Sequence, residues 1–249
     1  MAATSESIEL LVGNETIAGT LLAPQRRMPG ILFVHGWGGS QERDMLRGRH
    51  IAGLGCVCLT FDLRGHEKTR EQRKTITREQ NLEDMLVAYD RLVQHPATDP
   101  DRIAVIGTSY GGYLATILTS MRPVRWLAMR VPAMYWDEEW QVPKQELNRP
   151  RLMEYRRTRL GPEENRALAA CAEFTGDVLI VESEHDEHVP HTTIMNYRSS
   201  FQQAHSMTHR IIDDADHSLS TERCQQAYTS ILTGWISDMI IGDRIGHLS

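Results

Sequence analysis

The feature that most constrains this chain is the pentapeptide Gly107-Thr108-Ser109-Tyr110-Gly111, which directly follows the apolar run at residues 103–106. A strand that turns into a helix at one residue forces that residue into a strained backbone, and flanking glycines remove the Cβ atoms that would clash there. The apolar residues after Gly112 recur at helical spacing. The pattern therefore predicts a strand, a sharp turn and a helix, with the Ser109 hydroxyl presented outward.

Two polar clusters further along the chain can supply the partners that such a serine needs. A serine hydroxyl is a weak nucleophile at neutral pH, so it requires a base that takes its proton and a carboxylate that orients the base. One cluster, residues 182–190, follows the apolar run 177–181, and the other, residues 213–218, follows the run 209–212. Because open parallel sheets place their active sites at the carboxyl ends of strands, both clusters are expected near Ser109.

Four motifs occur in a fixed order along the chain. They are His35-Gly36-Trp37-Gly38-Gly39, Phe61-Asp62-Leu63-Arg64-Gly65-His66, the Ser109 pentapeptide, and the two acid and histidine clusters. With these motifs the chain resembles the α/β-hydrolase superfamily from about residue 29 to its last helix, in the serine esterase-like branch that holds dienelactone hydrolases and prolyl oligopeptidases. The resemblance implies the α/β class and the α/β-hydrolase fold, with a mostly parallel, doubly wound sheet.

The resemblance also implies roles for individual residues. Ser109 would be the nucleophile, Asp186 the acid and His217 the base, in the chain order of this superfamily. The main-chain N–H groups of Trp37 and Tyr110 would form the oxyanion hole.

At one position the chain departs from the superfamily. The Asp-Leu-Arg-Gly-His motif is usually followed by glycine, whereas this chain has Glu67. The conformation of that loop is therefore open.

Neighbouring residues offer competing interpretations. Glu184 and Glu187 are loop carboxylates beside Asp186, and the Asp-x-x-Val-Pro context favours Asp186. His185, His188 and His191 have a spacing that a metal ion could use. A serine hydrolase requires neither metal nor cofactor, and no cysteine or carboxylate completes a recognisable ligand spacing. We therefore expect no metal and no cofactor.

The charge and the N-terminal sequence argue against some classes of partner and predict a cytoplasmic protein. A net charge of −6 without a long basic run provides no footprint for nucleic acid or for an anionic membrane. The first residues lack a basic region followed by an apolar core, and no run of eighteen apolar residues occurs. Four cysteines without a disulfide pattern fit the cytoplasm, and Cys56 and Cys58 are expected in the core.

Strand and helix signals alternate along the chain, which is typical of a parallel sheet with helices on both faces. The predicted strands cover residues 8–12, 15–22, 31–34, 56–61 and 126–131, besides the runs already named, and the predicted helices cover residues 44–54, 81–94 and 221–241. Residues 1–132 and 174–249 form the predicted hydrolase core.

The segment 133–173 interrupts this alternation. It is far longer than a crossover requires, so it predicts a cap inserted after the sixth strand. Trp136 and Trp140 would lie on one face if the segment is helical and could wall an apolar acyl or aryl pocket. The alternative is that they pack the cap against the sheet. Arg151, Arg156, Arg157 and Arg159 could steer an acidic substrate, although a solvated helix face is the favoured interpretation.

These observations lead to a functional expectation. The chain is expected to cleave carboxylic esters of short to medium acyl or aryl groups through an acyl-enzyme, with a small-molecule ester as its partner. A thioesterase or small peptidase of the same fold is the alternative within this chemistry. A non-catalytic binding module on a hydrolase fold is the alternative from another class. Homo-oligomer formation is left open.

Overall fold

The computed structural model describes residues 4–23 and 27–246. Residues 1–3, 24–26 and 247–249 of the predicted core lie outside this range, and residues 1–3 also belong to the N-terminal stretch that was considered for targeting signals. Among the described residues, no helix has both the length and the apolar content needed to cross a membrane.

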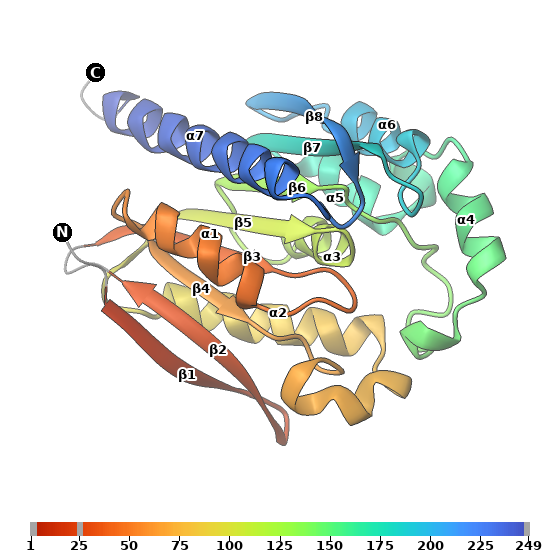
Figure 1. The fold of residues 1–249 in the computed structure, drawn as a ribbon, viewed down its shortest axis with the longest axis horizontal. Coiled ribbons are helices and arrows are strands. Elements are labelled where there is room, and N and C mark those ends of the chain that lie inside the picture. The colour runs from red at the N-terminus through yellow and green to blue at the C-terminus, as the bar shows by residue number, and fades with distance from the viewer. Residues whose placement is uncertain (1–3, 24–26, 247–249) are drawn as a thin grey trace.

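A single sheet of eight strands, counted over the described residues, forms the centre of the fold (Figure 1). Its spatial order is β1-β2-β4-β3-β5-β6-β7-β8, and the strands β3 to β8 run parallel to one another. The hairpin β1-β2 adds an antiparallel edge beside β4. The strands are β1 Thr4–Val12, β2 Glu15–Ala23, β3 Met28–Val34, β4 Val57–Phe61, β5 Thr98–Thr108, β6 Trp126–Arg130, β7 Asp177–His185 and β8 Ser206–Asp216. The mostly parallel, doubly wound sheet is therefore confirmed.

Helices cover both faces of this sheet. The α-helices are α1 Glu42–Ala52, α2 Arg78–Val93, α3 Tyr110–Leu118, α4 Arg149–Arg157, α5 Arg166–Glu173, α6 His191–Ser200 and α7 Glu222–Gly246, and the 3₁₀ segments are η1 Glu67–Lys74, η2 Lys144–Glu146 and η3 Pro162–Glu164. Helices α1 and α7 pack on one face, and α2, α3, α5 and α6 pack on the other.

The alternation of side chains along the buried strands produces two core clusters. In β3, Leu32 and Val34 join the cluster under α2 and α3, whereas Ile31 and Phe33 join the cluster under α1 and α7. Because successive strand residues point to opposite faces, a strand buried on both sides is apolar throughout. This explains the continuous apolar runs in the sequence.

The segment 133–173 contains η2, α4, η3 and α5. In Figure 1, α4 lies beyond the carboxyl end of β5, on the side where the parallel strands end. Helix α5 instead packs against α3 and α6. Its Leu168 and Cys171 are fully buried in the core cluster under α2 and α3. Residues 137–140 form a bend and turns rather than a helix, so Trp136 and Trp140 do not share a helix face.

Candidate active site

Ser109 occupies a sharp turn between β5 and α3. Its φ is +51° and its ψ is −111°, a backbone conformation that residues with a side chain rarely adopt. A Cβ atom on Gly111 would collide with the carbonyl oxygen of Val34, and one on Gly107 would collide with the backbone of Gly111 and Gly112. The two glycines are therefore required for β3, β5 and α3 to approach one another at this turn, as the sequence predicts.

His217 and Asp186 lie together at the ends of β8 and β7. His217 Nδ1 lies 2.6 Å from Asp186 Oδ2, and Asp186 Oδ1 accepts the main-chain N–H groups of His188 and Val189 at 2.7 Å each. Burial raises the pKa of Asp186, but His217 and the two N–H donors outweigh it and bring that pKa below its usual value. An ionised Asp186 accepts a hydrogen bond from Nδ1–H, which leaves Nε2 of His217 as a proton acceptor.

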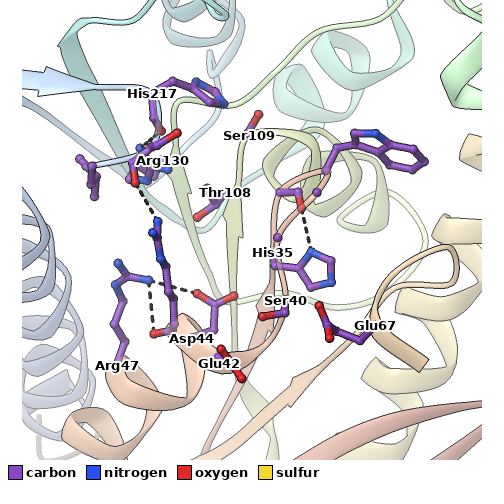
Figure 2. A pocket seen from close by; sticks show the side chains of 17 residues that line it. His35, Ser40, Glu42, Asp44, Arg47, Glu67, Thr108, Ser109, Arg130 and His217 are labelled. Carbon is purple, nitrogen blue, oxygen red and sulfur yellow. Dashed lines mark hydrogen bonds and ion pairs between the residues drawn. The ribbon is translucent and has the colours of Figure 1, made fainter. Parts of the chain in front are cut away.

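Ser109 and His217 line one cavity of about 430 Å³, with Trp37 on its wall (Figure 2). Figure 2 shows the Ser109 hydroxyl and the His217 ring in the same upper part of the view of the cavity. The side chain of Asp186 is only 3% exposed and is not among the lining residues. The structure thus brings the three predicted catalytic residues to one place, two at the cavity surface and one behind His217.

Two histidines fix the loop that carries Trp37. His35 bonds through Nδ1 to the Gly36 carbonyl at 2.8 Å, and His66 Nε2 accepts the Gly38 N–H at 2.9 Å. Burial and then the neighbouring His35 lower the pKa of His66 to about 3, so His66 stays neutral and can accept this bond at physiological pH. Among the described residues, no acceptor is found for the N–H groups of Trp37 or Tyr110.

Comparison with known proteins identifies the family. The model of the prolyl oligopeptidase family matches residues 45–242, which is most of the chain. This protein belongs to the prolyl oligopeptidase family. The match and the fold support a serine hydrolase. No curated protein matches the sequence.

Solved structures share the fold of this prolyl oligopeptidase family member at low sequence identity. A dienelactone hydrolase from Anabaena variabilis is 19% identical with a TM-score of 0.69, over 94% of this chain and 97% of that one. Est1E from Butyrivibrio proteoclasticus is 15% identical with a TM-score of 0.68, over 95% and 98%. An acylaminoacyl peptidase from Pyrococcus horikoshii is 16% identical with a TM-score of 0.72, over 96% of this chain but only 42% of that one.

The structure shows which conformation the loop after β4 adopts at Glu67, where the chain departs from the usual glycine. Glu67 has a φ of +41°, in the region that favours glycine, and it lines the cavity with Ser109. The chain thus keeps the backbone conformation that a glycine would adopt easily, with a carboxylate in its place. Outliers of this kind cluster at functional sites.

Arg130 is a site residue of this family member that the sequence analysis missed. Its carbonyl accepts the Ser109 N–H at 2.9 Å, and its Nη1 donates to the His217 carbonyl at 2.9 Å. The side chain is buried, and burial lowers its pKa to about 10, so it remains a cation. No carboxylate lies within 4 Å of this guanidinium in the described part of the chain. One signal was available, because Arg130 ends an apolar strand.

The two tryptophans predicted to bind substrate lie away from this cavity. Trp136 is 2% exposed, packs edge-on against Tyr155 and donates Nε1–H to Glu139. Trp140 is partly exposed and lies beneath the guanidinium of Arg166. These contacts favour packing of the segment over walling of a pocket, and a role in binding substrate stays a prediction.

Buried arginines hold the same segment through its main chain. Arg78 of α2 donates to the carbonyls of Trp136, Glu138 and Glu139, and Arg156 of α4 donates to those of Met134 and His188. The expectation that Arg156 lies on a solvated helix face is wrong, because its side chain is buried. A role of Arg156 in steering an acidic substrate stays a prediction. The contact of Arg156 with His188 also links the segment to the Asp186 loop.

The histidines considered as a metal cluster face different partners. His191 Nδ1 bonds to Glu182 at 2.6 Å, and the His188 ring lies edge-on to His217. Within the described ranges, the one group of side chains close enough to share a metal ion is Glu184, His185 and Asp214, all exposed. His188 and His191 are not part of it.

Proposed function

We propose that this protein is a serine esterase that cleaves small carboxylic esters with Ser109, His217 and Asp186. One observation carries the proposal. His217, bonded to the ionised and buried Asp186, lines the same cavity as a serine held at a φ of +51°. A nucleophile, a base and a residue that orients the base are the requirements for acyl transfer.

The reaction would proceed in two steps. His217 Nε2 takes the Ser109 proton as the hydroxyl oxygen attacks the ester carbonyl, and the N–H groups of Trp37 and Tyr110 stabilise the oxyanion. His217 then protonates the leaving alcohol, and an acyl-enzyme remains on Ser109. Water activated by His217 attacks this acyl-enzyme and releases the acid.

The likeness to a dienelactone hydrolase supports an ester as the substrate. The solved dienelactone hydrolase matches this chain over nearly its whole length, whereas the chain spans less than half of the acylaminoacyl peptidase. Peptidase activity is the second candidate, favoured by the family itself. We also propose that the part of residues 133–173 outside α5 acts as a cap, and that the enzyme works in the cytoplasm, which cell fractionation would test.

Labelling with a fluorophosphonate probe and hydrolysis of matched esters, thioesters and amides test this function. Ser109→Ala should abolish labelling and lower kcat by about 10³-fold or more. Asp186→Asn should lower kcat by about 10⁴-fold by misorienting the imidazole, whereas Glu184→Gln should change it less than tenfold. Ser218→Ala, which removes another hydroxyl from the cavity wall, is the control. An intact wild-type protein that resists labelling would indicate a binding module, and preferred amide cleavage would indicate a peptidase.

A further inference from the structure

A lysine from the capping segment reaches the predicted oxyanion residues. Lys144 Nζ lies 4.1 Å from the centre of the Trp37 ring, 5.0 Å from that of Tyr110 and 5.3 Å from that of Tyr135. The Lys144 N–H donates to the Ile76 carbonyl at 3.0 Å, which fixes η2 against the loop before α2. The ammonium group is therefore held beside the two residues whose N–H groups we assign to the oxyanion hole.

Arg73 of η1 provides a second cation on the same indole. Its guanidinium carbon lies 5.3 Å from the centre of the Trp37 ring. Over residues 4–23 and 27–246, no carboxylate lies within 4 Å of the charged groups of Lys144 or Arg73, whereas the nearby Arg64, Arg151 and Arg166 all have acidic partners. Ring faces attract both cations, but they do not neutralise their charge.

The surroundings of Lys144 add positive charge rather than remove it. Burial and then the charges of Arg156, Arg73, Arg78 and Arg149 hold the pKa of Lys144 well below its usual value. Arg78 and Arg156 are bound by main-chain carbonyls, so their own charges are not neutralised by acids either. A partly buried cation without a counter-ion is costly, and a bound anion would offset that cost.

We propose that Lys144 and Arg73, which both lie over the ring of the cavity residue Trp37, form a subsite for a carboxylate of the substrate. The substrate class is then a monoester of a short dicarboxylic acid. This inference rests on the proposed function and names its substrate class. Charge-assisted hydrogen bonds from the ammonium and the guanidinium to the carboxylate would supply the recognition.

Kinetics with two esters of equal length test the subsite. Wild-type kcat/KM should be higher for monomethyl glutarate than for methyl pentanoate. Lys144→Met should lower this ratio about tenfold or more, as expected for loss of one charge-assisted bond, and Arg73→Met should lower it less. Lys144→Arg should keep most of the preference. Lys74→Met removes an exposed charge from η1, next to Arg73, and should leave the ratio of the two kcat/KM values unchanged.

The pH dependence provides a signature of the ammonium itself. As pH rises through the lowered pKa of Lys144, its charge is lost, so the preference for monomethyl glutarate should decline at a lower pH than for an ordinary lysine. Lys144→Arg should remove this decline because a guanidinium stays protonated. Equal losses on both esters in Lys144→Met would overturn the subsite and leave Lys144 as an anchor of the cap.

A failure of the subsite can be distinguished from a failure of the proposed function. If neither ester is cleaved but a neutral fluorophosphonate labels Ser109, glutarate should slow labelling of the wild type and not of Lys144→Met. If Ser109 is not labelled at all, the esterase proposal fails, and glutarate binding measured by calorimetry tests the subsite alone. Binding that is lost in Lys144→Met supports the subsite, and binding that is absent or unaffected by the substitution refutes it.

Discussion

Three residues that line the cavity, Ser109, Glu67 and Leu219, have a φ in the region that disfavours side chains. For Ser109 the sequence predicts this strain, because glycines stand on both sides of it. For Glu67 the sequence does not predict the backbone conformation, because a glutamate at this position could either change the path of the loop or adopt the conformation of the usual glycine. Whether the loop changes or Glu67 adopts the glycine conformation depends on how later residues pack against the loop. Ile76 and Arg73, for example, leave no room for a Cβ atom on the nearby Gly65.

The strain at Glu67 leads to a stability prediction. Glu67→Gly should raise the free energy of unfolding by up to about 1 kcal/mol, because glycine adopts a φ of +41° at little cost. Urea unfolding measures this change. Glu71→Gly, at an exposed position within the same 3₁₀ segment, should instead lower stability. A loss of stability in Glu67→Gly would show that the side chain contributes more than its backbone strain costs.

Among the elements, the buried strands and the helices around them follow closely from the sequence, and their ends do not. Strands β7 and β8 continue to His185 and Asp216, into clusters predicted as loops, because each is paired with its neighbour along most of that length. Helix α2 begins at Arg78 because Thr77 and Gln80 form a capping box. Strand pairing depends on a segment far away in the chain and capping depends on side-chain hydrogen bonds, and hydrophobic periodicity detects neither.

The residues of the site also divide into those that the sequence predicts and those that it does not. Ser109, Asp186 and His217 could be proposed from motifs, because each motif is local. Arg130 and Lys144 could not, because their significance comes from groups far away in the chain, such as the His217 carbonyl and the Trp37 ring.

Arg130, the last residue of strand β6, bonds to the main chain of both Ser109 and His217, which predicts a positioning role for it. Arg130→Met should lower kcat about tenfold or more with little change in KM, because the His217 carbonyl loses its donor. Arg130→Lys should recover part of this loss. Arg47→Met is a matched control, since Arg47 is also buried and also lies over the Tyr228 ring but does not bond to His217. Equal kcat losses in both variants would argue against the role.

The capping segment gives a prediction at the level of packing. Trp136→Ala should lower the free energy of unfolding by about 3–5 kcal/mol, because it empties a buried site. The dependence of kcat/KM on acyl length should stay as in the wild type, since Trp136 does not line the cavity. Thermal unfolding and a series of methyl esters provide the two measurements. A flattened length profile in a folded variant would restore Trp136 to the substrate pocket.

For the whole molecule, His66 predicts how stability depends on acid. The pKa of His66 is 6.5 in the unfolded chain, and burial lowers it to about 3 in the folded protein. Between pH 3 and pH 6.5, unfolding is therefore coupled to the uptake of a proton by His66. Stability should therefore fall as pH drops from 6.5 towards 3, by on the order of a few kcal/mol from this residue. Denaturant titrations of wild type and His66→Asn measure the difference. An identical pH slope in both would refute the assignment.

The arginines that hold the capping segment bind its carbonyl oxygens, and these are the same whatever side chains the segment carries. Glu138 can therefore be exchanged without loosening Arg78, whereas Glu139 also accepts the Trp136 Nε1–H and has a φ of +56°. Selection, natural or in the laboratory, can then vary the exposed side chain at position 138 while the backbone of the segment stays bonded to α2. A library in this segment can therefore vary position 138 while Arg78 and Arg156 keep the backbone in place.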